Sequence, residues 1–164
     1  STNEVAYKNA LALIEAGADM VKLEGGKSLA PIVKYLKAKD IQVCGHIGHM
    51  PQSVHDKSNK TIQDVLKKSL ETILEDARML EESGVDMLVL SSVPEDIAKE
   101  ITETVSIPTI GFHSGQLCNG EVFILHDLLI NSNTPNDLYV SNVTSPHKTG
   151  IVKDFLLQFI KNHS

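Results

Sequence analysis

The sequence predicts an α/β protein built on a parallel sheet, and two features of the chain carry this prediction. Short apolar runs alternate with amphipathic helical stretches, as right-handed crossovers between parallel strands require. The segment EAGADM at 15–20 also returns as ESGVDM at 82–87, an offset of 67 residues from Gly17 to Gly84. A helix, a glycine, an aspartate and a strand that recur in this order are typical of repeated β/α units in a barrel.

Five strands are expected from short apolar runs that charged or glycine-containing segments bound. They cover residues 19–24, 41–47, 87–91, 107–112 and 122–126. Closing a β/α barrel takes eight strands and usually ~200 residues or more, whereas this chain has 164. The sequence therefore predicts an incomplete (β/α)8 TIM barrel, within a single domain over residues 1–164.

The first helix is expected at residues 4–16. Its apolar stripe consists of Tyr7, Leu11 and Ile14, which recur at helical spacing. Gly17 follows directly and can close the helix as a carboxyl-terminal cap. A helix that leads into the first strand is thus part of the repeated unit.

Four more helices are expected along the chain. Ser28 can cap the second, the longest ends at Gly84, and Pro94 suits the first turn of the next. After a polar stretch near 131–150, which is predicted to be a loop, a terminal helix is expected at 151–161.

Composition and charge narrow the range of functions. A net charge of −6 and a pI near 5.6 argue against a general nucleic-acid binder. No apolar run approaches the ~20 residues that span a membrane, and no signal peptide opens the chain. The two cysteines, Cys44 and Cys118, are expected to be free thiols in a reducing cytoplasm.

Candidate functional residues gather at the predicted carboxyl ends of the strands, where parallel α/β proteins place their chemistry. Lys22 and Glu24 are two residues apart and precede Gly25 and Gly26, so their side chains leave one face of the strand. They fit either a polar ligand site or a solvated strand end. The other strand ends add His46, His49, Ser91, Ser92, His113, Ser114 and His126.

Several kinds of site remain open at these positions. His46 fits either a hydrogen-bonded core histidine or a site residue, and the turn at 111–115 fits either an anion-binding or an ordinary tight turn. A zinc site of His46, His49 and His113 does not match the usual helical spacing, and no Gly-x-Ser-x-Gly elbow surrounds Ser91. A hard cation such as Mg²⁺ near Glu24 fits better, because it takes one or two carboxylates plus substrate oxygens.

At these motifs the sequence resembles the ketopantoate hydroxymethyltransferase family, also called 3-methyl-2-oxobutanoate hydroxymethyltransferases. The resemblance covers about residues 3–130 and follows the family's order nearly without gaps. The matching stretches are AGADMVKLEGG (16–26), VCGHIGHMPQSVH (43–55), LEDARMLEESGVDMLVL (74–90), VPEDIAKEIT (93–102), IPTIG (107–111) and CNGEVFILHDLL (118–129).

The resemblance implies a TIM barrel, of which this chain carries about strands 4–8, in a cytoplasmic homo-oligomer. It implies transfer of a hydroxymethyl group from 5,10-methylenetetrahydrofolate to 3-methyl-2-oxobutanoate, giving ketopantoate for pantothenate biosynthesis. The family reaction uses Mg²⁺ to polarise the 2-oxo acid before a base removes its C3 proton. On this pattern Glu24 is a metal ligand, and Lys22 and His46 bind the substrate.

The chain also departs from the family pattern at positions that bear on chemistry. Ser91 stands where the family has a glutamate that acts as the base, and a hydroxyl cannot accept a proton near neutral pH as a carboxylate does. Two aspartates of the family's metal site and a substrate-binding serine have no counterpart in the chain. Two hypotheses follow: an enzyme of this family, or a divergent relative that binds a small oxo acid or serves a structural role without turnover.

Overall fold

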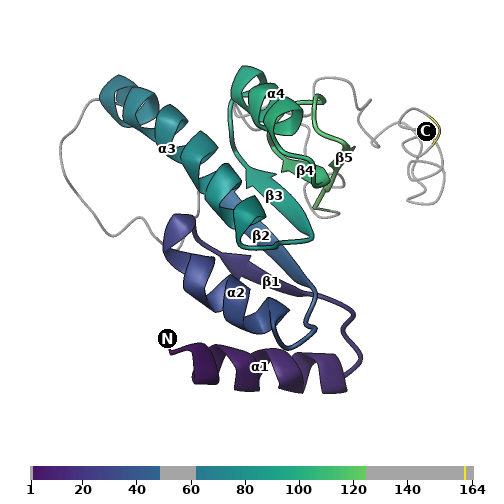
Figure 1. Cartoon of the computed structure of the whole chain (residues 1–164). Helices are drawn as coiled ribbons and strands as arrows, with labels where there is room; N and C mark the ends of the chain where they lie inside the picture. Colours follow the sequence, from purple (N-terminus) through teal and green to yellow (C-terminus); the bar gives the residue numbers. More distant parts are fainter. Residues whose placement is uncertain (1, 49–61, 125–160, 162–164) are drawn as a thin grey trace. The chain divides into compact units, whose positions relative to one another are not determined.

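The computed structural model describes residues 2–48, 62–124 and 161, apart from the side chains of 62–70. Figure 1 shows the elements in chain order. The helices are α1 (Asn3–Glu15), the 3-10 turn η1 (Lys27–Leu29), α2 (Ala30–Lys37), α3 (Ile62–Glu82) and α4 (Glu95–Thr104). The strands are β1 (Val21–Glu24), β2 (Val43–Gly48), β3 (Met87–Ser91), β4 (Thr109–Phe112) and β5 (Gly120–Glu121).

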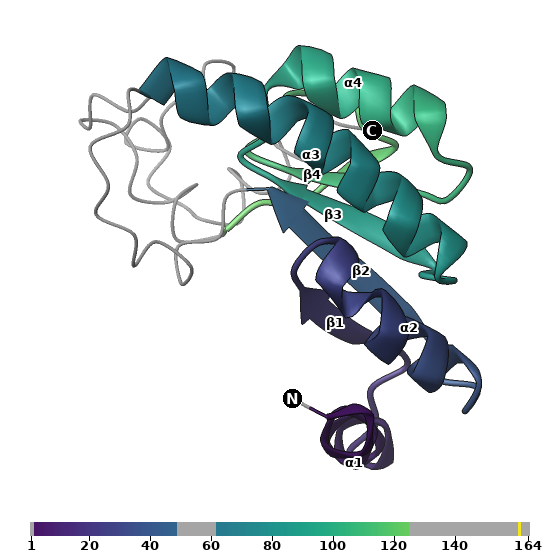
Figure 2. The same ribbon diagram turned by 60° about the vertical axis from the view of Figure 1, so that its left-hand side comes forward.

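The five strands form one parallel sheet in the order β1-β2-β3-β4-β5. Figure 2 shows α2, α3 and α4 on one face of this sheet. Consecutive strand order with helices on a single face is the winding of a β/α barrel, whereas doubly wound sheets reverse their order and carry helices on both faces. The predicted α/β class with a parallel sheet is confirmed.

The core lies between the sheet and these helices. Gly45 of β2 faces it closely, because a Cβ atom there would lie 2.9 Å from Leu88 and 3.3 Å from Leu80 of α3. The largest fully buried apolar side chains are Val33, Leu36, Val43, Ile47, Leu80, Leu88, Leu90, Val93 and Ile101. In the part of the chain that the structure describes, no helix is long and apolar enough to cross a membrane.

The internal repeat is also a structural repeat. At the end of α1 the N–H of Gly17 donates to Ile14 and that of Ala18 donates to Leu13, at 2.9 and 3.0 Å. At the end of α3, Gly84 and Val85 make the same pair of bonds, to Glu81 and Leu80. This is the Schellman arrangement, and it requires the positive φ of 103° and 97° that the two glycines adopt.

Two side chains each lie directly before a strand and bind the first residue of the neighbouring strand. We call this arrangement a strand clamp. Asp86, before β3, accepts a hydrogen bond from the N–H of Val43 at the start of β2, at 2.7 Å. Asn119, before β5, accepts one from the N–H of Thr109 at the start of β4, at 2.9 Å. The Asp86 carboxylate also pairs with the Lys37 ammonium at 2.7 Å.

Three details of the predicted elements are wrong. The last strand is β5 at 120–121 rather than 122–126, because the Asn119 clamp starts the pairing with β4 earlier. Residues 122–124 are not strand, and residues 125 and 126 lie outside the described residues. Ser28 does not cap α2, whose N-cap is Leu29, since Asp76 of α3 binds the N–H of Lys27 and holds the preceding turn. Leu11 is 37% exposed, whereas Ala10 is the buried residue of α1.

Other elements agree with the prediction or cannot be compared. Pro94 directly precedes the first residue of α4, as its N-cap. The polar loop near 131–150 lies outside the described residues, as does the helix expected at 151–161 except for Lys161, which is helical. By its contacts the chain divides into two compact units, Ser1–Glu121 and Val122–Ser164, and the sheet lies wholly in the first.

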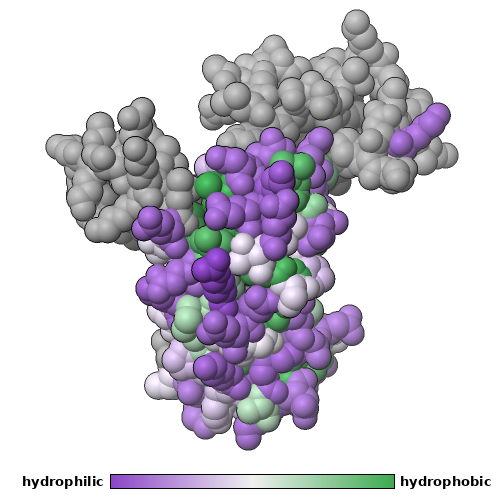
Figure 3. Space-filling model, turned by 45° about the horizontal axis from the view of Figure 1, so that its top comes forward, coloured by the Kyte–Doolittle hydropathy of each residue, from purple (hydrophilic) through white to green (hydrophobic). Residues whose placement is uncertain are grey.

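Figure 3 shows a surface that is largely hydrophilic over the described residues, with separate hydrophobic patches. Such scattered apolar exposure is normal for a folded protein. The large apolar side chains that are exposed are Val5, Leu11, Leu13, Leu117, Val122 and Ile124.

The Asp86 clamp generates a stability prediction. Asp86→Ala leaves the N–H of Val43 and the Lys37 ammonium without their partner, so we expect it to lower the free energy of unfolding by about 1–3 kcal/mol. Asp86→Asn keeps an oxygen acceptor, as the natural Asn119 does, and is expected to cost less. Urea denaturation measures both, with Glu103→Ala on exposed α4 as the control; equal losses for Ala and Asn would contradict a clamp.

Candidate functional site

The pairing of β1 with β2 brings the candidate side chains together. Glu24 is the register partner of His46, and Lys22 is the partner of Cys44. Because alternate residues of a strand point to opposite faces, these four side chains leave the same face of the sheet. Gly45, between Cys44 and His46, points into the helix-covered core, so the four lie on the face opposite the helices.

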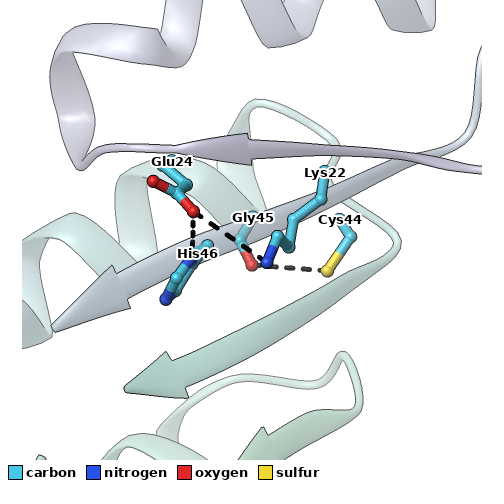
Figure 4. Close-up of polar contacts among 5 residues, drawn as sticks. All are labelled: Lys22, Glu24, Cys44, Gly45 and His46. Carbon is cyan, nitrogen blue, oxygen red and sulfur yellow. Dashed lines mark hydrogen bonds and ion pairs between the residues drawn. The ribbon is translucent and has the colours of Figure 1, made fainter. Parts of the chain in front are cut away.

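Lys22, Glu24 and His46 converge at the carboxyl ends of these two strands, as Figure 4 shows. The Nδ1 atom of His46 lies 3.2 Å from Oε1 of Glu24, and the Lys22 ammonium lies 4.0 Å from the same oxygen. The Lys22 and Glu24 side chains are 50% and 43% exposed, whereas the His46 side chain is only 10% exposed. A polar ligand can thus reach the Lys22 ammonium and the Glu24 carboxylate, which lie beside the buried ring of His46.

The environment of His46 favours the neutral ring. Burial lowers the pKa of His46 below its usual value of 6.5, and the nearby Lys22 ammonium lowers it further, against the opposing effect of Glu24. A carboxylate only accepts hydrogen bonds, so Nδ1 carries the proton and donates to Glu24. Nε2 is then a bare acceptor; it is buried and has no hydrogen-bond partner among the residues that the structure describes. A buried acceptor of this kind is available to a ligand that donates a hydrogen bond.

Cys44 is the residue of this face that the sequence interpretation did not place in the site. Its thiol is buried and donates to the carbonyl of Gly45 at 3.4 Å. Burial raises the pKa of the Cys44 thiol, although Lys22 opposes the shift, so the reactive thiolate is disfavoured. Its position two residues before His46 was the available signal, since the strand period places both on one face.

Ser91 lies on the same face, at the end of the next strand. In the β2–β3 register His46 pairs with Val89 and Gly48 with Ser91, so Ser91 is two residues further toward the carboxyl end. The residue is 4% exposed. The structure therefore places Ser91 near the strand ends that carry the other candidates, with a hydroxyl and no carboxylate at that position.

The turn after β4 has a clear structural role. Ser114 is buried, and its hydroxyl donates to the carbonyl of Leu90 at 2.8 Å and accepts from the N–H of Val93 at 3.1 Å. Beside this turn, the Glu95 carboxylate accepts a hydrogen bond from the N–H of Gln116 at 3.0 Å. The ring of His113 stacks on Phe112 with centroids 4.1 Å apart. These contacts favour the ordinary tight turn over an anion-binding one.

A metal site is not complete among the described residues. They contain no group of three or more His, Cys, Asp or Glu side chains that could hold a metal ion. Glu24 contributes a carboxylate to the cluster of described residues, and this carboxylate already contacts His46 and Lys22. These residues alone do not fit a magnesium site, which needs further oxygen ligands. His49 and His126 lie outside the described residues, so the zinc alternative with His49 cannot be compared.

The protonation of His46 is directly testable by NMR titration. We expect its ring to titrate below pH 6.5, with Lys22→Met raising the pKa and Glu24→Gln lowering it. The unfolded chain then binds the proton more readily than the fold does, so this group makes the fold less stable as the pH falls through 6.5 and below. A ring pKa above 6.5, or no response to Lys22→Met, would contradict the charge arrangement described above.

Comparison with known proteins identifies the family. Residues 1–154 match the model of the ketopantoate hydroxymethyltransferase family. The 3-methyl-2-oxobutanoate hydroxymethyltransferase of Nitrosomonas eutropha is 45% identical over 124 residues, which cover 76% of this chain and 46% of that protein. The enzyme of the same name from Thermoanaerobacter sp. is 40% identical over 155 residues, covering 94% of this chain and 52% of its own length.

The chain thus spans about half the length of these curated relatives. Among solved structures, dihydrodipicolinate synthase from Agrobacterium tumefaciens aligns with a TM-score of 0.49 and 13% identity, over 77% of this chain and 43% of that one. The family match extends over most of the chain, and it includes the strands that carry Lys22, Glu24, His46 and Ser91. The chain belongs to the ketopantoate hydroxymethyltransferase family.

Proposed function

We propose that Lys22, Glu24 and His46 form the 2-oxo acid subsite of a ketopantoate hydroxymethyltransferase. The reaction is transfer of a hydroxymethyl group from 5,10-methylenetetrahydrofolate to 3-methyl-2-oxobutanoate, giving ketopantoate in pantothenate biosynthesis. The observation that supports this proposal is that Lys22 and His46 both approach one oxygen of Glu24. The Lys22 ammonium lies 4.0 Å from Oε1 of Glu24, and Nδ1 of His46 lies 3.2 Å from it. A cytoplasmic homo-oligomer is the proposed form of the whole protein.

Each side chain has a role that its chemistry suits. The exposed Lys22 ammonium complements the carboxylate of the substrate and the negative charge that develops when C3 loses its proton. The bare Nε2 atom of His46 can accept a hydrogen bond from the hydroxymethyl group of the product. Glu24 orients the ring through Nδ1, which keeps Nε2 unprotonated.

Turnover requires groups that the described residues do not contain at this cluster. A base must remove the C3 proton, and Ser91 has no carboxylate with which to do so. Mg²⁺, the proposed metal, would polarise the keto group when bound, with Glu24 as one of its ligands; its other ligands would come from outside the described residues.

The second candidate function is binding of the oxo acid without turnover. Ser91 favours it, because a serine hydroxyl stands where the family's base is expected, while Lys22, Glu24 and His46 remain in place. The two candidates share the subsite and differ in proton transfer from C3. Measurements of binding and of proton exchange therefore separate them.

The subsite predicts a charge dependence of binding. We expect 3-methyl-2-oxobutanoate to shift the NMR signals of the Lys22 and His46 side chains. Removing the ammonium with Lys22→Met should weaken binding by about tenfold or more, since a hydrogen bond to a charged group contributes about 1.5–3 kcal/mol. Lys99→Met, which removes an exposed lysine from α4, is the matched control. Equal weakening by both variants would refute a specific role for Lys22.

Proton exchange tests turnover. When Mg²⁺ is supplied, we expect the isolated chain to bind the oxo acid without exchanging its C3 proton for deuterium above the buffer rate. Ser91→Glu alone should not start this exchange, because one added carboxylate does not complete the metal site. Exchange of the C3 proton by the unmodified chain would instead show a base other than Ser91 and would favour the enzyme over the binding protein.

A further inference from the structure

The backbone turn that follows β1 lies directly beyond Glu24 and is held at two points. At its near end the N–H of Gly25 donates to the carbonyl of His46 at 3.0 Å, and Gly25 adopts a φ of 140°, a conformation that favours glycine. At its far end the N–H of Lys27 donates to Oδ1 of Asp76 on α3, at 2.7 Å. The carboxyl end of β1 is thereby attached both to β2 and to α3.

The Asp76 carboxylate also packs against the backbone of Gly26. A Cβ atom on Gly26 would overlap both oxygens of this carboxylate, so the carboxylate comes this close only because the residue is glycine. The φ of Gly26 is −87°, a value that other residues adopt as well. The approach of Asp76, rather than the backbone conformation, therefore requires a glycine at this position.

Glu75, the residue before Asp76, contacts the same turn in a different way. Its carboxylate pairs with the Lys27 ammonium at 2.9 Å, and the Glu75 and Lys27 side chains are 57% and 50% exposed. An exposed ion pair of this kind contributes little to stability. Asp76 therefore binds the backbone of the turn, whereas Glu75 binds only the end of a side chain.

The position of this turn bears on the contact between Glu24 and His46. The His46 ring is buried and belongs to β2, whereas Glu24 is the last residue of β1 and directly precedes the turn. The 3.2 Å between Nδ1 of His46 and Oε1 of Glu24 is at the long end of the range for a hydrogen bond, so a small displacement of Glu24 would break it. The hydrogen bond at Nδ1 in turn decides which ring nitrogen carries the proton.

We propose that Asp76 is a positioning residue of the oxo acid subsite, because it holds the turn after β1 so that Glu24 stays against Nδ1 of His46 and Nε2 stays bare. Asp76 comes from α3, which lies on the face of the sheet opposite the subsite (Figure 2), so it acts through the backbone of Gly26 and Lys27. The inference rests on the proposed function only for the identity of the ligand.

The ring nitrogens of His46 report this arrangement directly. In the isotope-labelled full chain, NMR distinguishes a ring that is protonated at Nδ1 from one that is protonated at Nε2, and His46→Gln identifies the signals by their loss. We expect Nδ1 to carry the proton in the unmodified chain. In Asp76→Ala the ring signals should shift at least roughly halfway to those of Glu24→Ala, in which the partner of Nδ1 is absent. The ring pKa should also fall, because Glu24 raises it.

Three further variants separate positioning from a general loss of stability. Asp76→Asn keeps the oxygen that accepts from Lys27 and should restore the ring signals of the unmodified chain. Glu75→Ala removes only the exposed ion pair and should leave these signals unchanged. Asp86→Ala weakens the fold at the other end of β2 and should leave them unchanged as well.

Gly26→Ala tests the same contact from the other side, and it serves in place of Asp76→Ala if that variant does not fold. The added Cβ displaces the Asp76 carboxylate, so the His46 ring signals should shift in the same direction. In the double variant, Gly26→Ala should add nothing to Asp76→Ala, because the oxygens that the Cβ would meet are gone.

Unchanged ring signals in folded Asp76→Ala or Gly26→Ala would overturn the proposal. A shift of equal size in Glu75→Ala or Asp86→Ala would also overturn it, since the effect would then belong to surface charge or to lower stability. These measurements use neither oxo acid nor turnover. Failure of the oxo acid to bind would therefore refute the proposed function, while the ring signals of His46 would still decide the role of Asp76.

Discussion

The register between β1 and β2 is the constraint on which the rest of this site depends. Pairing Glu24 with His46 sets which side chains meet, and a slip of one residue would turn every side chain of β1 to the other face. Such a slip would bury Lys22 and Glu24 against the helices and expose the apolar side chains of Val21 and Leu23. The cost of burying unpaired charges makes that alternative unfavourable, so the apolar core and the polar site enforce the same register.

The same constraint explains the properties of His46. Its position in β2 buries the ring, and its partner in β1 presents a carboxylate to Nδ1. Burial and Lys22 together oppose protonation, so the interaction with Glu24 is a hydrogen bond from a neutral ring rather than a full ion pair. An exposed Lys–Glu pair contributes little stability by itself. The Lys22–Glu24 pair therefore stabilises the fold little, in keeping with the binding role that we propose for it.

The sequence predicted the elements whose signals are local, and it was less accurate where tertiary contacts decide. The alternation of apolar runs and amphipathic stretches located the first four strands to within two residues at each end. The start of β5 depends on the side chain of Asn119 bonding to Thr109, ten residues away, and no apolar pattern reports that bond. The start of α2 likewise depends on Asp76 of α3 rather than on Ser28. The helical period placed Leu11 in the apolar stripe of α1, but Leu11 is exposed and the smaller Ala10 is buried.

In the candidate site, too, local spacing could be predicted from the sequence, whereas contacts between strands could not. Lys22 and Glu24 could be placed on one face from their spacing alone, and parallel strands imply that His46 ends at the same edge. The contact between His46 and Glu24 needed the register, which spacing within one strand does not determine. The protonation of His46 needed its burial as well. Ser91 could be compared with a family pattern, but only the sheet order shows that it shares a face with His46 on the adjacent strand.

Binding of the proposed oxo acid and proton transfer from it require different groups, and the described residues do not contain all of them. Under the proposed function, binding of an anionic oxo acid needs a cation on a rigid edge, and β1 carries Lys22 there. Proton transfer also needs a base and a metal whose ligands come from several strands around a barrel. β1 is the terminal strand of the described sheet, so it presents Lys22 at the border of that sheet. Within the described sheet β1 pairs with β2, and these two strands carry Lys22, Glu24 and His46 but not the further carboxylates that turnover needs.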